Sequence, residues 1–168
     1  GGTFWSKKRD FKNTPATAPV ALYYARTGET ARAQALLDWL DARLFDPDQG
    51  LYRDGLRIAP GGEVVLESAI YTYNQGPVLG ALLELGGEAN LARAATLVAS
   101  VARSLTLPAP LTGRGATVLR CEGTGDGGLF TGILVRYLAL AAVDGRLPAA
   151  TRATAAALVN DTAEAFWA

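Results

Sequence analysis

Three stretches of the chain share one order of apolar and polar positions. In each, a segment that is apolar on nearly every side runs into a glycine turn, and a segment with apolar residues at helical spacing follows. The turns lie at Gly28, Gly86 and Gly145, about 60 residues apart. Alanine and leucine favour helix, and a glycine after an apolar run commonly ends one. The pattern predicts three helical hairpins, over residues 14–46, 71–105 and 128–168.

The two helices predicted for each hairpin differ in how much of their surface is apolar. Residues 80–85 and 138–142 are apolar on nearly every side, which is typical of a helix buried among others. The second helices keep a polar face, as residues 33–44 do. We therefore expect an all-α fold, an α/α toroid in which inner helices line an axis and outer helices surround them. Tetratricopeptide and ankyrin arrays repeat near 34 residues and do not fit this spacing.

Three hairpins are half of the six that close an (α/α)6 barrel. We expect residues 1–168 to form one domain segment, the C-terminal half of such a ring, with apolar flanks exposed at both ends of the arc. Longer irregular stretches, roughly residues 46–70 and 106–127, connect the hairpins. Within the first, residues 50–56 alternate apolar and polar positions and predict a short strand pair.

Composition narrows the classes of function. The 16 basic and 16 acidic side chains cancel, which argues against nucleic acid or an anionic membrane surface as a partner. No apolar run reaches the roughly 18 residues of a membrane span. Histidine is absent and Cys121 is the one cysteine, so the usual zinc sites and histidine-dependent catalysis cannot be assembled. We expect no metal and no cofactor, and carboxylates and tyrosines remain to carry chemistry.

Polar and aromatic residues collect just before each predicted inner helix, at residues 11–14, 71–76 and 126–131. Because all inner helices of a toroid begin at the same end, these clusters converge on one funnel. Residues 71–76 combine two tyrosines with two adjacent amides, which offer flat apolar faces and bidentate hydrogen-bonding groups suited to a sugar ring. Trp5 is the tryptophan best placed to join this funnel.

The candidate binding residues are Asn13, Asp54, Tyr71, Tyr73, Asn74, Gln75, Asp126 and Phe130. For some of them a purely structural role is an open alternative. Asn13, Asn74 and Asp126 are each placed to cap a helix, and Asp54 to form a turn. The chain contains no two neighbouring acids, whereas glycoside hydrolysis normally uses two carboxylates. The residues alone favour a sugar-shaped pocket over a complete catalytic site.

Five motifs follow one another along the chain: GGTFW at 1–5, FKNTP at 11–15, LYRDG at 51–55, YTYNQG at 71–76 and DGGLFTG at 126–132. Taken in this order, they resemble glycoside hydrolase family 76, the α-1,6-mannanases. The resemblance covers nearly the whole chain, and YTYNQG is its most specific element. It implies an (α/α)6 barrel that cleaves α-1,6-mannosidic bonds with retention, using a consecutive aspartate pair as nucleophile and acid/base.

That aspartate pair lies upstream of the segment that resembles residues 1–5, so the resemblance implies that the catalytic residues belong to an N-terminal half outside this chain. It also implies α-mannan or a manno-oligosaccharide as partner and an extracellular or cell-envelope location. It makes Asp54 a hydrogen-bond partner of bound mannose and places Asn13 and Phe130 at the rim or wall of the funnel. Where the family often has lysine, this chain has Thr131, which removes a charged contact.

Three other interpretations stay open. A non-catalytic glycan-binding module or pseudoenzyme agrees with the missing acid pair. Another α/α-barrel enzyme, such as a sugar epimerase or an unsaturated uronyl hydrolase, fits less well without histidine and with few basic residues near the funnel. A helical scaffold for protein partners leaves residues 71–76 unexplained. Burial of those residues in packing, away from any cleft, would count against the glycan interpretation.

Overall fold

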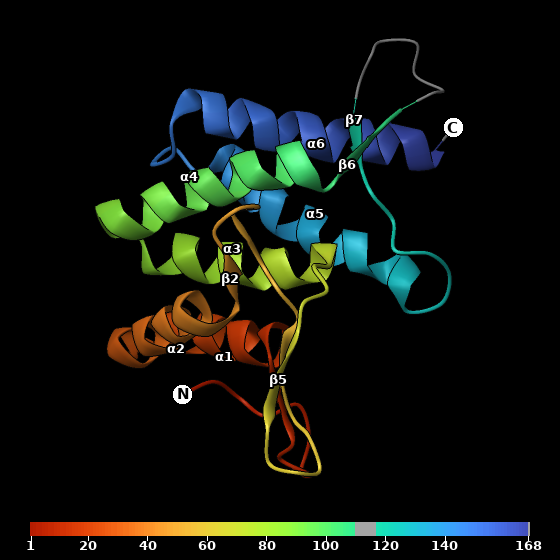
Figure 1. Ribbon diagram of the computed structural model, residues 1–168. Coiled ribbons are helices and arrows are strands. Elements are labelled where there is room, and N and C mark those ends of the chain that lie inside the picture. The colour runs from red at the N-terminus through yellow and green to blue at the C-terminus, as the bar shows by residue number, and fades with distance from the viewer. Residues whose placement is uncertain (110–116, 168) are drawn as a thin grey trace.

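The computed structural model describes residues 1–109 and 117–167. In this part of the chain, three helical hairpins stack side by side (Figure 1). They are α1 (Thr14–Arg26) with α2 (Thr30–Leu44), α3 (Thr72–Leu85) with α4 (Gly87–Ser104), and α5 (Gly127–Val143) with α6 (Ala149–Trp167). The molecule is 60% helical, and the predicted α/α arrangement of three hairpins is confirmed.

Helix α3 is the central inner helix. It packs against α1 on one side and α5 on the other, with its hairpin partner α4 outside it (Figure 1). Nearly every residue from Thr72 to Leu83 is buried: residues 76–83 are apolar all round, and the polar residues Thr72, Asn74 and Gln75 are buried with them. The outer helix α2 buries one face only, through Ala33, Leu37, Leu40 and Leu44. The division into inner and outer helices therefore follows the pattern of apolar positions.

Two glycines let α5 lie close against α3. A Cβ atom at Gly80 would come within 2.5 Å of the Tyr137 ring, and one at Gly76 within 2.9 Å of the Ile133 carbonyl oxygen. Any larger residue at these positions would push the helices apart. The glycines thus set how closely the Tyr137 ring approaches α3.

The inner helices at the two ends of the arc each keep one side uncovered. The exposed apolar side chains on these helices include Leu129, Ile133, Leu140 and Val143 in α5 and Tyr23 in α1. These are the flanks expected of an open arc. None of the helices in the described ranges is both long and apolar enough to cross a membrane.

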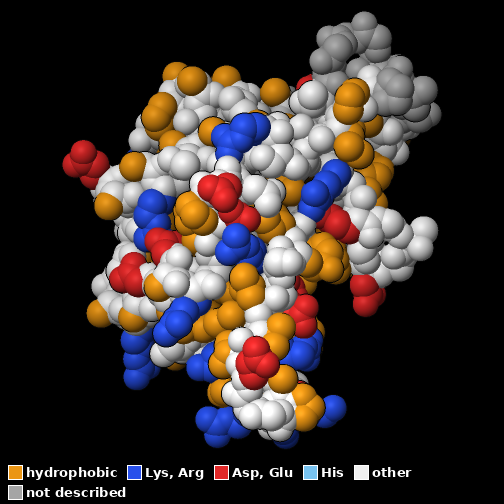
Figure 2. Space-filling model, in the orientation of Figure 1, with side chains coloured by type: hydrophobic (Ala, Val, Ile, Leu, Met, Phe, Trp, Pro, Cys, Tyr) orange, Lys and Arg blue, Asp and Glu red, His pale blue; other side chains and the backbone are white. Residues whose placement is uncertain are grey.

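The connections contain short antiparallel strands. One sheet has the order β1 (Phe11–Asn13), β4 (Gly55–Ile58) and β5 (Val64–Glu67). Two strand pairs complete the set: β2 (Phe45–Asp46) with β3 (Leu51–Tyr52), and β6 (Thr106–Pro108) with β7 (Thr117–Leu119). The three-stranded sheet projects from the helical body, and basic side chains gather around its tip (Figure 2).

The strand pair predicted within residues 50–56 is wrong in its pairing. Strand β3 pairs with β2, whereas β4 pairs with β1 and β5. Between them the N–H of Arg53 donates to the Leu44 carbonyl and the N–H of Asp54 to the Ala69 carbonyl, so the chain changes partner there. Alternation of apolar and polar residues marks a strand, but it does not select the partner strand.

Candidate functional site

A cleft of about 540 Å³ lies where the inner helices begin. All three inner helices start at the same end of the molecule (Figure 1), as the toroid arrangement requires. The cleft is lined from the N-terminal segment, α1, α3 and the start of α5 by Trp5, Pro15, Pro19, Tyr73, Pro77, Asp126, Phe130, Ile133, Arg136 and Tyr137. We call it the inner cleft.

Three aromatic rings form a cluster at this cleft. Tyr71 and Tyr73 stack with ring centroids 5.5 Å apart and planes 18° from parallel. Phe130 packs against Tyr73 at 4.1 Å and meets Tyr71 edge-on at 5.7 Å. Flat ring surfaces of this kind bind the apolar faces of sugars, whose hydroxyl groups then point to polar neighbours.

Asp54 is the carboxylate attached to the cluster. The Tyr73 hydroxyl donates to its Oδ1 atom at 3.0 Å. Burial raises the pKa of Asp54, while hydrogen bonds from Tyr73 and Asn74 oppose that rise. Burial and the nearby Asp54 charge also raise the pKa of the Tyr73 hydroxyl, which therefore stays protonated as a donor. The Asp54 side chain points to Tyr73. The Asp54 backbone carbonyl accepts from the Thr14 N–H, and the Asp54 N–H donates to the Ala69 carbonyl.

The two amides of the tyrosine–amide motif lie beneath the rings. Gln75 is fully buried: its Oε1 accepts from the Tyr52 N–H, and its Nε2 donates to the carbonyls of Tyr52 and Tyr71. Asn74 is also fully buried, and its Nδ2 donates to the Tyr52 carbonyl at 3.5 Å. Because neighbouring helices surround α3, these positions do not face the cleft. The direct sugar contact predicted for both amides is corrected to a supporting position under the tyrosines.

The capping alternatives separate in the structure. Asn13 is buried and its Oδ1 accepts from the Ala16 N–H at 3.1 Å, so this side chain caps α1 and does not line the cleft. Asn74 lies inside α3, past the cap position of Tyr71. Asp126 occupies the cap position of α5 but makes no capping hydrogen bond, and it lines the cleft with an exposed side chain.

Of the eight predicted residues, the structure brings Tyr73, Asp126 and Phe130 to the cleft wall and places Tyr71 and Asp54 in contact with Tyr73. Sequence reasoning missed the α5 residues Ile133, Arg136 and Tyr137. They follow Phe130 at three- and four-residue steps, so helical periodicity was the signal that could have found them. Thr131 turns inward and donates to the Arg120 carbonyl.

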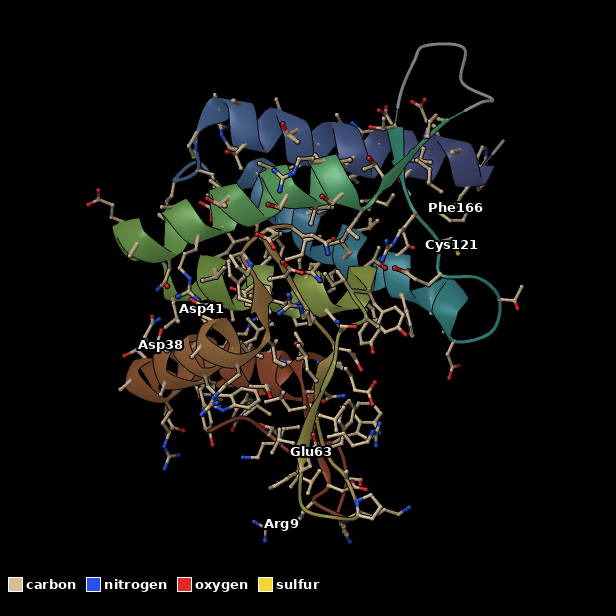
Figure 3. All side chains as sticks on the ribbon, in the orientation of Figure 1. Arg9, Asp38, Asp41, Glu63, Cys121 and Phe166 are labelled. Atoms are coloured by element: carbon tan, nitrogen blue, oxygen red, sulfur yellow. The ribbon has the colours of Figure 1, made fainter. Side chains whose placement is uncertain are left out.

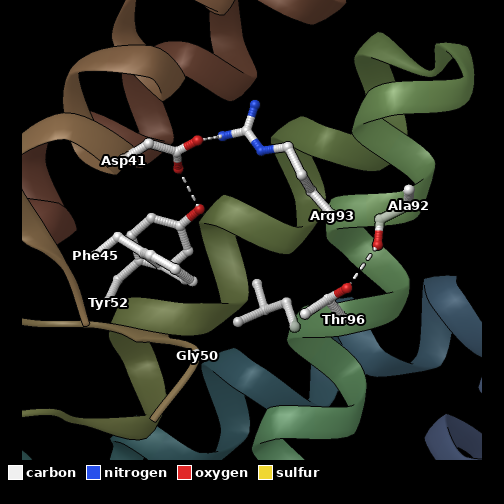
Figure 4. Close-up of a pocket in the computed structure, with 8 residues that line it drawn as sticks. Asp41, Phe45, Gly50, Tyr52, Ala92, Arg93 and Thr96 are labelled. Atoms are coloured by element: carbon white, nitrogen blue, oxygen red, sulfur yellow. Dashed lines mark hydrogen bonds and ion pairs between the residues drawn. The ribbon is translucent and has the colours of Figure 1, made fainter. Parts of the chain in front are cut away.

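A second cleft, of about 290 Å³, lies on the outer helices between α2 and α4 (Figure 4). There the Tyr52 hydroxyl donates to Asp41 at 2.6 Å, and Asp41 pairs with Arg93 at 2.6 Å. Asp38 and Asp41 both sit on the outer helix, away from the inner-helix starts (Figure 3). We call this the outer cleft. The described residues contain no cluster of three or more side chains able to hold a metal ion.

An arc of α/α hairpins with an aromatic cleft at the starts of its inner helices defines the chain as part of an α/α toroid. The sequence model of glycosyl hydrolase family 76 matches residues 1–168, and the chain belongs to this family. No curated protein shows a significant match.

Solved structures agree with this assignment. The chain is 34% identical to the GH76A alpha-1,6-mannanase from Salegentibacter sp. HEL1_6, with a TM-score of 0.81 over 98% of this chain and 50% of the mannanase. An inactive variant of that enzyme, with two aspartates replaced by alanine, has been solved in complex with alpha-1,6-mannotetrose. The Lin0763 protein from Listeria innocua is 29% identical, with a TM-score of 0.69 over 92% of this chain and 45% of that protein.

A family 76 glycoside hydrolase from a bovine Bacteroides thetaiotaomicron strain, 21% identical with a TM-score of 0.65, shares the fold over 80% of this chain and 31% of that one. The chain thus spans half the length of the solved mannanase it matches, or less of the others named. The matched structures are α/α barrels, which confirms the predicted half-ring. That it is the C-terminal half stays a prediction.

Proposed function

We propose that this chain is the sugar-binding half of a glycoside hydrolase that cleaves α-1,6-mannosidic bonds with retention. The observation that carries the proposal is the three-ring cluster with its Tyr73–Asp54 hydrogen bond, at the inner cleft of a family 76 chain. The 34% identity to an alpha-1,6-mannanase supports α-mannan or a manno-oligosaccharide as the substrate.

In this proposal the inner cleft binds and shapes one mannose unit. A ring face stacks on Tyr71, Tyr73 or Phe130, and Asp54 accepts hydrogen bonds from sugar hydroxyls. One aspartate of a pair outside this chain attacks the anomeric carbon while its neighbour protonates the departing glycosidic oxygen, and water later cleaves the glycosyl-enzyme. Contacts from Asp54 accelerate the reaction to the extent that they tighten as the sugar ring flattens toward the transition state.

The second candidate function is glycan binding without cleavage. It is favoured by the absence of two neighbouring acids anywhere in the sequence. A chain that acts alone in this way would bind manno-oligosaccharides and release no shorter products. The two candidates share the inner cleft and differ only in whether an aspartate pair from another half faces it.

The test is Asp54→Ala in a polypeptide that joins residues 1–168 to the half that precedes them. Because the lost contact strengthens in the transition state, we expect kcat on an α-1,6-manno-oligosaccharide to fall roughly 100-fold, a magnitude typical of one lost transition-state hydrogen bond. The change in ground-state affinity should be much smaller. Equal loss of kcat and affinity, or no loss of either, would contradict the role given to Asp54.

A further inference from the structure

A segment far along the chain holds the start of α3. The Glu122 carboxylate accepts the Thr72 N–H at 2.8 Å through Oε1 and the Thr72 hydroxyl at 2.7 Å through Oε2. The side chain of Glu122 is only 10% exposed. In the sequence, Thr72 lies between the two stacked tyrosines, Tyr71 and Tyr73. The Glu122 carboxylate therefore holds, through Thr72, the backbone from which both rings extend.

The same segment is tied to α5. The Arg120 guanidinium donates to the Ile70 carbonyl and approaches Glu122 Oε1 at 3.3 Å. The Arg120 carbonyl in turn accepts from the Thr131 hydroxyl at 2.8 Å. Thr131 directly follows Phe130, the third ring of the cluster. Residues 120–122, which we call the clamp, thus join the first turn of α3 to Thr131, near the start of α5.

The clamp lies on the strand-to-helix connection that passes the start of α3, where Figure 3 labels Cys121. Helix α3 has no capping side chain at Tyr71 and no acid in its first turn. Glu122 supplies the missing negative charge from a distant part of the sequence, and it also satisfies a free helical N–H.

Capping alone does not explain this position. Helices α2 and α4 also lack a capping side chain and form without one. What is particular to the clamp is that each of its anchor points adjoins a ring of the cluster: Thr72 adjoins Tyr71 and Tyr73, and Thr131 adjoins Phe130. A shift of either helix start would change the gap between the Tyr73 and Phe130 rings, whose centroids are 4.1 Å apart.

We propose that Glu122 is a positioning residue that sets the geometry of the Tyr71–Tyr73–Phe130 platform and, through it, sugar affinity. The proposal rests on the proposed function for its sugar readout only. The geometry of the rings can be measured without any sugar.

The experiment compares Glu122→Gln with wild type in the full chain. The substitution keeps the shape of the side chain but removes the charge and one acceptor. Near-ultraviolet circular dichroism reports the coupling of the stacked tyrosines, and calorimetry with α-1,6-mannotriose reports affinity. We expect a changed near-ultraviolet spectrum and roughly 5- to 10-fold weaker binding, as for loss of a hydrogen bond to a charged group. Glu88→Gln, an exposed acid in the first turn of α4, is the matched control and should change neither readout.

If Glu122→Gln fails to fold, Thr72→Val and Thr72→Ser replace it. Valine removes the hydroxyl donor to Glu122 and should weaken binding, while serine keeps the donor and should bind like wild type. A lower melting temperature with a wild-type spectrum and wild-type affinity would overturn the proposal, because the clamp would then serve stability alone. If wild type itself does not bind mannotriose, the proposed function fails, while the spectra still decide the positioning role.

Discussion

In the part of the chain that the structure describes, the outer and the inner cleft each contain a tyrosine that donates to a carboxylate, and they differ in what else the carboxylate meets. In the outer cleft, Asp41 accepts from Tyr52 and is neutralised by Arg93 at 2.6 Å. At the inner cleft, Asp54 accepts from Tyr73 at 3.0 Å, and none of the described residues forms an ion pair with it. The Asp41 carboxylate thus has a charged partner within the chain, whereas the hydrogen bonds to the Asp54 carboxylate come from neutral groups.

In the proposed function, this difference makes Asp54 the acid that meets the sugar. A carboxylate paired with arginine has its charge and acceptor positions occupied, and such a pair between two helices stabilises packing. A carboxylate held by neutral donors keeps its charge and further acceptor capacity for hydroxyl groups. Tyr73, which donates to that carboxylate, lines the inner cleft together with Phe130 and stacks on Tyr71. In the proposed function, similar residue types therefore stabilise packing in one place and bind sugar in the other.

The largest expected effect is that of Tyr73→Ala on sugar affinity. The substitution removes a stacking surface and the hydrogen bond to Asp54, so affinity for α-1,6-mannotriose should fall roughly 10- to 100-fold. Calorimetric titration measures the change. Tyr52→Phe in the outer cleft is the control and should leave affinity within about 2-fold of wild type. An equal loss of mannotriose affinity in the two variants would contradict the assignment of sugar binding to the inner cleft alone.

Next in size is the effect of Gly80→Ala on the wall of the inner cleft. The added methyl would stand 2.5 Å from the Tyr137 ring, so overpacking should cost about 1–3 kcal/mol of unfolding free energy. Gly132→Ala, on α5 with no atom within 4 Å of the new methyl, should instead stabilise the helix by about 0.5–1 kcal/mol. Urea unfolding compares the two. Destabilisation of the same size in both variants would contradict the close approach of α3 and α5.

Tyr52→Phe tests the structural role of the outer cleft. It removes the hydroxyl that donates to Asp41 at 2.6 Å, and loss of one such hydrogen bond costs about 1 kcal/mol. The midpoint of urea unfolding should fall accordingly. An unchanged midpoint would show that the Asp41–Arg93 pair holds the outer helices without help from the tyrosine.

The smallest expected effect is a pH dependence at Asp54. Because burial raises its pKa in the folded chain, its contribution to stability is full below the ordinary value of 3.8 and is lost as the pH rises through the folded value. Asp54→Asn, which never carries the charge, should therefore be slightly more stable than wild type at pH 7. The gap should close toward pH 4. A gap that widens on acidification would reverse the sign given to the pKa shift.

Much of the fold follows from local patterns. The hairpins and the exposed flanks could be predicted because inner and outer helices differ in the spacing of their apolar residues. That spacing depends only on the sequence of each helix. The strand pairing within residues 50–56 could not, because partner choice depends on hydrogen bonds from Arg53 and Asp54 to residues elsewhere in the chain. Residues 120–122 were missed for the same reason, since their contact with Thr72 spans 50 positions.

The site was predictable in its chemistry more than in its orientation. The tyrosine–amide motif contributes Tyr73 to the inner cleft, whereas neighbouring helices bury Asn74 and Gln75 on other sides of α3. Asn13 and Asp126 belong to the same class of capping residues, yet backbone geometry makes only Asn13 a cap. Residue type alone thus allowed capping, burial or exposure at the cleft, and the packing of the helices determined which of these each residue adopts.

The most direct test maps where α-1,6-mannotriose binds to the full chain by NMR chemical-shift changes. We expect shifts at Tyr71, Tyr73, Phe130 and the backbone of Asp54, and none at the side chains of Tyr52 and Arg93 in the outer cleft. Shifts confined to the outer cleft, or no shifts at sugar concentrations that saturate a solved family 76 mannanase, would contradict it.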